Sequence, residues 1–120
     1  MVGKFRLLRR YRILRGPDFA RVYKRRCSAA DDVLIVHGFK NELLAPRLGL
    51  TVSRKVGNAV TRNRWKRAIR EAFRQIRHDL PDGIDLVVTP RRGAKPEAAP
   101  VRASLVGLAR RIERKLTRGG

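Results

Sequence analysis

Hydrophobic residues recur at helical spacing between residues 54 and 77, and this pattern organises the rest of the chain. Its apolar members fall three or four residues apart, which places them on one side of an α-helix: Trp65, Ile69, Ala72, Phe73, Ile76 and Leu80. Gly57 and Asn58 precede this run as a turn and an N-cap, because an asparagine side chain accepts hydrogen bonds from the free amides of a first helical turn. The pattern therefore predicts an amphipathic helix that begins near Asn58.

Two apolar runs before this helix predict β-strands. Residues 33–39 form the first strand, and residues 47–53 are expected to be its partner across the connection 41–46. After the helix, residues 84–88 are almost continuously apolar, which is typical of a central or parallel strand. A strand, a helix and a strand in succession predict that the strand ending at Ser53 pairs in parallel with this one.

Further helices are predicted near both ends of the chain. One follows Pro17 and carries an apolar cluster on one side: Phe19, Val22 and Tyr23. The other covers residues 101–116, with an apolar stripe against the sheet. Prolines bracket residues 89–100, where we expect an exposed, mobile loop with neither helix nor strand. Gly107 costs the last helix about 1 kcal/mol relative to alanine, and close packing would explain its presence.

Length and charge limit the fold and the partners of the chain. Its 120 residues, 42% of them hydrophobic, suffice for a modest core, so residues 1–120 are predicted to form a single domain. The formal net charge of +20 indicates a polyanionic partner, either nucleic acid or an anionic membrane surface. Residues 1–15 carry six cations and no acid. They are predicted to form a mobile arm, and a basic helix on a membrane surface is the alternative.

Cysteine usage and hydropathy favour a cytoplasmic protein. The single Cys27 can form no internal disulfide and has no second cysteine for a zinc site, which indicates a reducing compartment. No apolar run approaches the roughly 20 residues of a membrane span. The N-terminal residues lack the apolar segment and the cleavage site of a signal peptide.

The polar side of the central helix is almost entirely basic. Residues 54–77 hold nine lysines and arginines but one acid, Glu71, so pairs within the helix cannot neutralise this side. A phosphate bound near the helix start would meet backbone amides, the positive end of the helix dipole and guanidinium groups together. The alternative is an ordinary capped helix whose arginines point into water.

The start of this helix resembles the signature of a known protein family. The residues concerned are KVGNAVTRNRWKR at positions 55–67, continued by Arg70 and Glu71. They are similar to the RNR signature of the protein subunit of bacterial ribonuclease P, K-x-G-x-A-V-x-R-N-R-x-K-R-x-x-R-E, at every fixed position. A looser resemblance covers residues 10–117. It implies a single α+β domain in the order α-β-β-β-α-β-α, with a short added strand near residues 27–30, a four-stranded mixed sheet packed by helices and an unusual left-handed β-α-β crossover.

The resemblance also implies a function and partners. Ribonuclease P is a ribonucleoprotein endonuclease that removes the 5′ leader from precursor tRNA, and its RNA subunit is the catalyst, with Mg²⁺ held mainly by that RNA. The protein binds the catalytic RNA and precursor tRNA and broadens the substrate range. The resemblance implies neither binding to a membrane nor an obligate protein partner. The residues expected to bind the catalytic RNA are Lys55, Asn58, Arg62, Asn63, Arg64, Lys66, Arg67 and Arg70.

A cleft for the single-stranded leader is implied as well. Phe19 and Tyr23 would border it, and His37 is a further candidate in a position where the family often has an aromatic residue. Stacking of an unpaired base on an aromatic ring is worth about 1 to 3 kcal/mol. The alternatives are that Phe19 and Tyr23 form the core side of a short helix and that His37 is a partly exposed strand histidine.

The sequence shows no catalytic machinery of the protein's own. His37 and His78 lie far apart, and neither adjoins a serine, cysteine or acid in a recognisable nucleophilic motif. Asp79, Asp82 and Asp85 do not have the spacing of a calcium loop and are predicted to be turn formers. The rival interpretation is a structural RNA-binding protein, such as a ribosomal protein, which gives no reason for the full signature. A helix-turn-helix DNA-binding protein fits less well, because strands flank the central helix.

Overall fold

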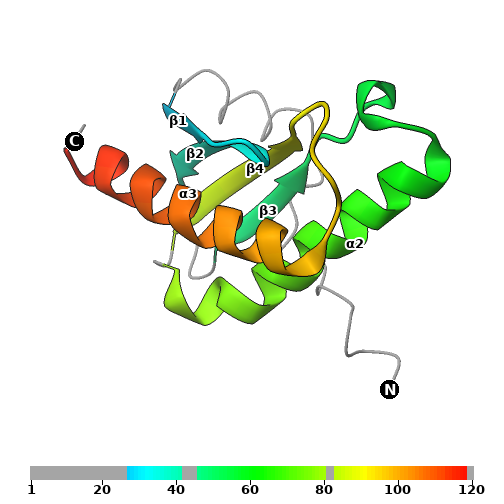
Figure 1. Cartoon of the computed structure of the whole chain (residues 1–120). Helices are drawn as coiled ribbons and strands as arrows, with labels where there is room; N and C mark the ends of the chain where they lie inside the picture. Colours follow the sequence, from blue (N-terminus) through cyan, green and yellow to red (C-terminus); the bar gives the residue numbers. More distant parts are fainter. Residues whose placement is uncertain (1–26, 42–45, 81–82, 119–120) are drawn as a thin grey trace.

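The computed structural model describes residues 27–41, 46–80 and 83–118. They form four strands and two α-helices (Figure 1): β1 (Cys27–Ala30), β2 (Leu34–Lys40), β3 (Arg47–Leu50), α2 (Ala59–Ile76), β4 (Ile84–Pro90) and α3 (Ala98–Arg118). Short 3-10 turns at Arg54–Val56 and Arg77–Asp79 flank α2. The predicted first helix and the predicted arm at residues 1–15 lie outside the described residues.

The strands form one mixed sheet in the order β1-β2-β4-β3. β2 pairs antiparallel with both β1 and β4, whereas β3 and β4 are parallel, which confirms the predicted pairing across the central helix. The predicted pairing of β2 with β3 is wrong, because β4 lies between them. Nearly every residue of β4 is buried, and a strand that is covered on both faces belongs in the middle of a sheet.

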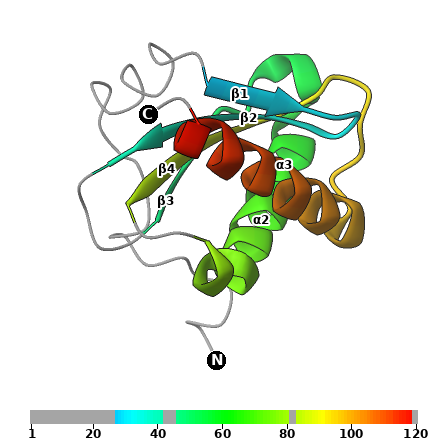
Figure 2. The same ribbon diagram turned by 90° about the vertical axis from the view of Figure 1, so that its left-hand side faces the viewer.

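Both helices pack on one face of the sheet and lie side by side (Figures 1 and 2). At Gly38 of β2 the backbone lies so close to α3 that an added Cβ would come within 2.1 Å of Ile112 Cγ2, so only glycine permits this approach. The core between the two layers consists of apolar side chains with little or no exposed surface; the largest are Leu34, Val36, Trp65, Ile69, Phe73, Ile84, Leu86, Leu105, Leu108 and Ile112.

The loop predicted at residues 89–100 is shorter than expected. Thr89 and Pro90 pair with β2, and α3 already begins at Ala98. Pro100 falls in the first turn of α3, where a missing amide hydrogen removes no intrahelical bond. Neither described helix has the length and apolarity that crossing a membrane requires.

The C-terminal half of α3 is tied to the edge strand β1. Arg111 Nη1 donates to the carbonyl oxygen of Ala30 at 3.1 Å, and Lys115 Nζ donates to that of Ser28. Gly107, in contrast, is exposed, and a Cβ there would have no atom of the described chain within 4 Å. Close packing within this part of the chain therefore does not explain Gly107.

Asp85 is a buried residue of β4 and not a turn former. Its side chain accepts hydrogen bonds from Nε and Nη2 of Arg47 at 2.9 and 2.7 Å and from Asn41 Nδ2 at 2.5 Å. Arg47 stands directly opposite Asp85 in the parallel pair, which explains the bidentate geometry. Asp79 does lie in the 3-10 turn after α2, and Asp82 is outside the described residues.

Candidate nucleic-acid interface

The chain enters α2 through a loop that its own polar side chains hold. Ser53 Oγ accepts a hydrogen bond from the amide of Lys55 at 3.3 Å. Gly57 follows with a φ of 141°, a region that favours glycine. Asn58 Oδ1 then accepts from the amide of Thr61 at 3.0 Å, which confirms the predicted cap. The loop thus presents the exposed Lys55 next to the first turn of α2.

The apolar side of α2 fixes the orientation of the helix. Five residues of the predicted stripe are buried: Trp65, Ile69, Ala72, Phe73 and Ile76. The sixth, Leu80, follows the helix and is partly buried against the core. Burial of one large apolar side chain stabilises the fold by about 1.5 to 3 kcal/mol. Rotation of α2 about its axis would lose several such contributions, so the opposite side of the helix stays in solvent.

The predicted RNA-binding residues of α2 lie on this solvent side and its flank. Three of them are exposed: Asn63, Arg64 and Arg67. The other three are half-buried: Arg62, Lys66 and Arg70. Within the described ranges, Arg64, Lys66 and Arg67 form no hydrogen bond or ion pair through their side chains. Arg62 Nε is buried and likewise has no partner there. Such cations bind anions without first giving up an internal partner.

Glu71, the single acid of α2, is engaged by its own helix. Its carboxylate accepts hydrogen bonds from Nε and Nη2 of Arg74 at 3.1 and 2.5 Å and from Gln75 Nε2 at 3.1 Å. Hydrogen bonding to Glu71 raises the pKa of Arg74, which therefore stays charged. One carboxylate, already hydrogen-bonded to Arg74, cannot balance all the cations of α2.

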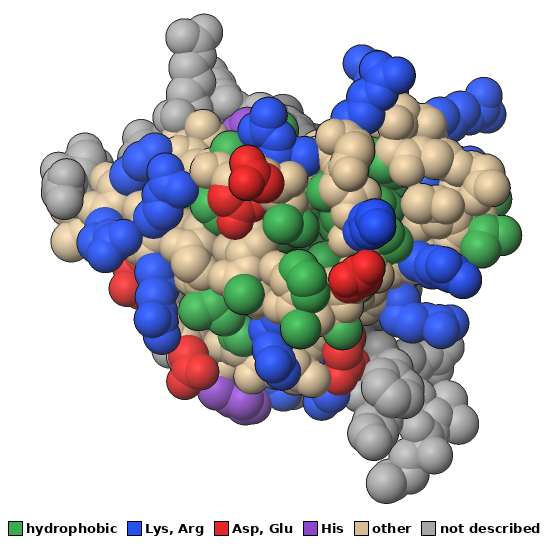
Figure 3. All heavy atoms as spheres, viewed as in Figure 1, with side chains coloured by type: hydrophobic (Ala, Val, Ile, Leu, Met, Phe, Trp, Pro, Cys, Tyr) green, Lys and Arg blue, Asp and Glu red, His purple; other side chains and the backbone are tan. Residues whose placement is uncertain are grey.

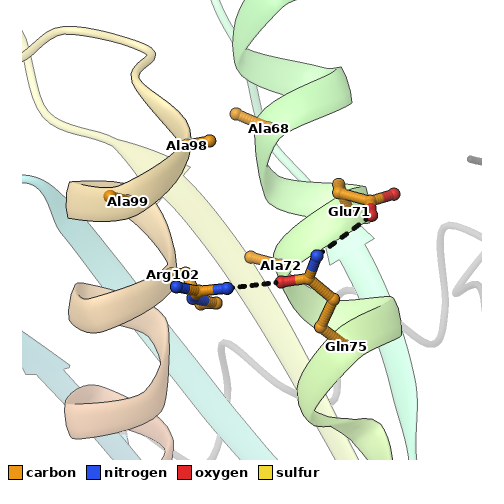
Figure 4. Close-up of a pocket in the computed structure, with 7 residues that line it drawn as sticks. All are labelled: Ala68, Glu71, Ala72, Gln75, Ala98, Ala99 and Arg102. Carbon is orange, nitrogen blue, oxygen red and sulfur yellow. Dashed lines mark hydrogen bonds between the residues drawn. The ribbon is translucent and has the colours of Figure 1, made fainter.

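The same hydrogen bonds continue to α3. Gln75 Oε1 accepts from Arg102 Nη1 at 3.1 Å, beside a pocket of about 150 Å³ between the two helices (Figure 4). Alanines of both helices line most of the rest of this pocket: Ala68, Ala72, Ala98 and Ala99. Sequence reasoning missed this bridge, because Gln75 and Arg102 are 27 residues apart and each resembles an ordinary surface residue. The bridge holds the flanks of α2 and α3 together.

His37 belongs to a different surface. Because Val36 and Gly38 of β2 face the helices, the alternation of a strand directs His37 to the opposite face of the sheet. The side chain is half-buried, and burial lowers its pKa, so the imidazole is neutral at pH 7. It is thus separated from the basic side of α2 by the thickness of the sheet. Phe19 and Tyr23 lie outside the described residues.

The arrangement suits the binding of a polyanion. Backbone amides at the capped start of α2, guanidinium groups of the same helix and the preceding Lys55 lie on or just before α2, and phosphate groups are the ligands that such donors prefer. Among the described residues, no three His, Cys, Asp or Glu side chains are grouped so that they could hold a metal ion.

Known proteins are similar to this chain in sequence and in fold. A family model described as Ribonuclease P matches residues 7–113. The ribonuclease P protein component of Oleidesulfovibrio alaskensis is 46% identical over 92 residues, which cover 75% of this chain and 74% of the relative. That of Thermotoga maritima is 38% identical over 110 residues, covering 88% and 94%. The solved structure of the Staphylococcus aureus RNase P protein matches with a TM-score of 0.75 and 38% identity, covering 83% of this chain and 93% of that one.

Proposed function

Because this chain belongs to the ribonuclease P family of protein components, we propose that it binds both the catalytic RNA of that enzyme and the 5′ leader of precursor tRNA. Ribonuclease P is an endoribonuclease of tRNA processing, and its protein component works with an RNA subunit. In this proposal the chain assists removal of the leader, which gives mature tRNA 5′ ends, and broadens the range of substrates.

The observation that carries the proposal is the unneutralised basic side of α2. Arg64, Lys66 and Arg67 have no partner among the described residues, and the one acid of the helix is held by Arg74. An uncompensated row of like charges weakens an isolated helix. Phosphates of a folded RNA would remove this repulsion, and each displaced counterion would make binding more salt-dependent. Lys55, Asn58, Arg62, Asn63 and Arg70 complete the proposed surface.

The chemistry belongs to the RNA subunit in this proposal. Mg²⁺ ions, held mainly by that RNA, would supply charge that activates water and stabilises the leaving oxygen. The cations of this chain reduce the repulsion between RNA strands that must come close together. We place the complex in the cytoplasm, with no membrane and no obligate protein partner.

Replacement of Arg64 and Arg67 by alanine tests the α2 surface. The double variant is expected to bind the catalytic RNA more weakly, and the slope of log affinity against log salt should become shallower by about 1.5 to 2 because two phosphate contacts are lost. Binding is measured over a series of NaCl concentrations, together with cleavage of precursor tRNA by the cognate RNA with and without the protein.

The matched control removes the same charge elsewhere. Arg91 and Arg92 are exposed in the loop between β4 and α3, so Arg91→Ala with Arg92→Ala lowers the net charge equally without touching α2. Equal losses in both double variants would mean that only net charge matters. Binding that stays unchanged in the α2 variant would leave its arginines as solvated surface residues and favour a different RNA-binding role.

The proposed leader contacts, Phe19, Tyr23 and His37, are tested with two substrates. His37→Ala, alone and combined with Phe19→Ala and Tyr23→Ala, should reduce the affinity of the holoenzyme for precursor tRNA more than for mature tRNA, because only the precursor carries the leader. Loss of one stacked base corresponds to about 1 to 3 kcal/mol. Equal losses on the two substrates would assign these side chains to the packing of the protein.

A further inference from the structure

A second group of cations lies on the C-terminal half of α3. Four of the six residues at positions 110–115 are basic and exposed, and Glu113 is the one acid among them. We call these four residues the α3 cluster: Arg110, Arg111, Arg114 and Lys115. Figure 3 shows basic side chains gathered over this end of α3 on one side of the molecule, and over the region of α2 on the other.

Only half of the α3 cluster is engaged within the described chain. Arg111 and Lys115 donate hydrogen bonds to β1 carbonyl oxygens. Arg110 and Arg114, one helical turn apart, form no hydrogen bond or ion pair within residues 27–41, 46–80 and 83–118. Cations stabilise the last turn of a helix through its dipole, which accounts for Arg114. Arg110 lies two turns before the end, where that effect has faded.

Gly107 supplies an independent observation. Ala103 precedes it by one helical turn on the solvent side of α3, and both residues are exposed. Glycine weakens a helix relative to alanine, and a side chain at this position would meet no atom of the described chain. These small residues immediately precede Arg110 and Arg114 along the exposed part of α3. A partner could therefore bring its own backbone close to the helix and reach both guanidinium groups.

We infer that Gly107, Arg110 and Arg114 form a second RNA-docking surface, which takes the phosphate backbone of a segment of the catalytic RNA other than the segment at α2. This inference rests on the proposed function. Charge complementarity selects a polyanion, because two unpartnered guanidinium groups stand a turn apart, about 6 Å along the helix axis. The surface is distinct from every residue of the α2 surface.

The orientation of the layers favours the catalytic RNA over the substrate. His37, the candidate leader contact, faces the side of the sheet that α3 does not cover. The two helices approach each other through Gln75 and Arg102, and the basic side chains over α2 and over the C-terminal end of α3 gather on opposite sides of the view in Figure 3. A single RNA segment at α2 would not also reach Arg110. A large folded RNA can supply two segments, and the protein would then hold them at a fixed spacing.

The test removes the charge in one variant and adds a side chain at Gly107 in another. Arg110→Ala with Arg114→Ala is compared with the Arg91→Ala, Arg92→Ala control, which has the same net charge. Gly107→Gln is compared with Gly107→Ala; both improve helix propensity, but only glutamine extends into the docking surface. For each full-length variant we would measure the melting temperature, the affinity for the catalytic RNA over a salt series, and the backbone positions that the protein protects from hydroxyl radicals.

The expected result has three parts. The Arg110, Arg114 variant loses about 2- to 30-fold in affinity relative to its control. Gly107→Gln weakens binding at an unchanged or higher melting temperature, whereas Gly107→Ala does not. The protection lost in these variants falls on a different RNA segment from that lost in the Arg64, Arg67 variant.

Three outcomes would overturn the inference. Affinity equal to that of the control would leave α3 as a solvated surface while the α2 proposal stands. Lost protection on the same segment as for α2 would mean that one RNA segment contacts both helices. A loss confined to precursor tRNA binding would show that the partner of α3 is the substrate. If the Arg64, Arg67 variant also binds normally, the proposed function fails independently of this surface.

Discussion

Asp31 lies in the turn between β1 and β2, where its carboxylate accepts hydrogen bonds from the amides of Val33 and Leu34 at 2.8 and 2.9 Å. Burial alone would raise the pKa of this carboxyl. The nearby Ser104 hydroxyl, the hydrogen bonds from the two amides and the charge of Arg111 together outweigh burial and lower the pKa. The ionised side chain thus holds the turn that leads into β2.

Asp31→Ala should destabilise the protein at pH 7 by about 1 kcal/mol, because the turn amides lose their acceptor. A lowered folded-state pKa means that this stabilisation is present above the unfolded-state pKa, near 4, and is lost as the pH falls through the folded-state value. The difference from wild type should therefore shrink toward pH 3. Denaturant unfolding, followed by the fluorescence of the buried Trp65, measures it.

Asp32 is the matched control for this prediction. It is the neighbouring acid, is exposed, and Asp32→Ala removes the same charge from the same turn. An equal loss of stability in both variants, or a gap that does not depend on pH, would contradict the role of Asp31.

At the scale of elements, α2 packs into the core on one side and carries the proposed RNA-binding residues on the other, and its first turn joins the two sides. The buried stripe orients the helix, while Asn58 satisfies an amide that would otherwise be free at the position where the proposed RNA phosphate binds. Gly57 permits the turn just before it, since its φ of 141° is strained for other residues. Stability and RNA binding should therefore be separable at Asn58.

Asn58→Ala is expected to cost about 1 kcal/mol of stability through loss of the cap. Asn58→Asp keeps the cap and suits the helix dipole, so the free energy of unfolding should be retained. Its carboxylate, however, repels RNA phosphates, and affinity for the catalytic RNA should fall below that of Asn58→Ala at low salt. Equal RNA affinities for the two variants would argue that no phosphate comes near this turn.

The elements that the sequence predicted well are those that local spacing determines. The stripe of α2, its cap and its basic side were all readable, because each depends on residues within a few positions of one another. The order of the strands could not be predicted in the same way, because β2 and β3 are neighbours in sequence but β4 lies between them in the sheet. Asp85 was misread for the same reason, since its partner Arg47 lies 38 residues earlier. Phe19 and Tyr23 stay predictions.

For the whole molecule, the dominant quantity is a formal net charge of +20 on 120 residues. Both helices present basic sides to solvent, and within the described ranges Asp85 and Glu71 are already engaged by arginines. Self-repulsion of this kind lowers the stability of a compact state and is relieved by bound anions. The free protein should consequently depend on its salt environment.

Sulfate should raise the melting temperature of the protein more than chloride does at matched ionic strength, because a divalent anion binds the native cationic surface and not the unfolded chain. A domain of this size gains about 4 °C for each kcal/mol of such binding. Sulfate also stabilises proteins generally through exclusion from their surface. The Arg64→Ala, Arg67→Ala variant separates these effects. It should keep the stabilisation that comes from exclusion of sulfate and lose part of the stabilisation that comes from sulfate binding. An identical sulfate increment in both proteins would exclude specific binding at α2.

The contact between α3 and β1 has a consequence for the protein at high concentration. β1 is an edge strand, and edge strands invite pairing with another copy of the chain and hence aggregation. Here the carbonyl oxygens of Ser28 and Ala30 are already occupied by Lys115 and Arg111. An incoming strand would have to displace two charged donors and approach a cationic border, so this border acts as a gatekeeper that keeps the sheet from growing across molecules.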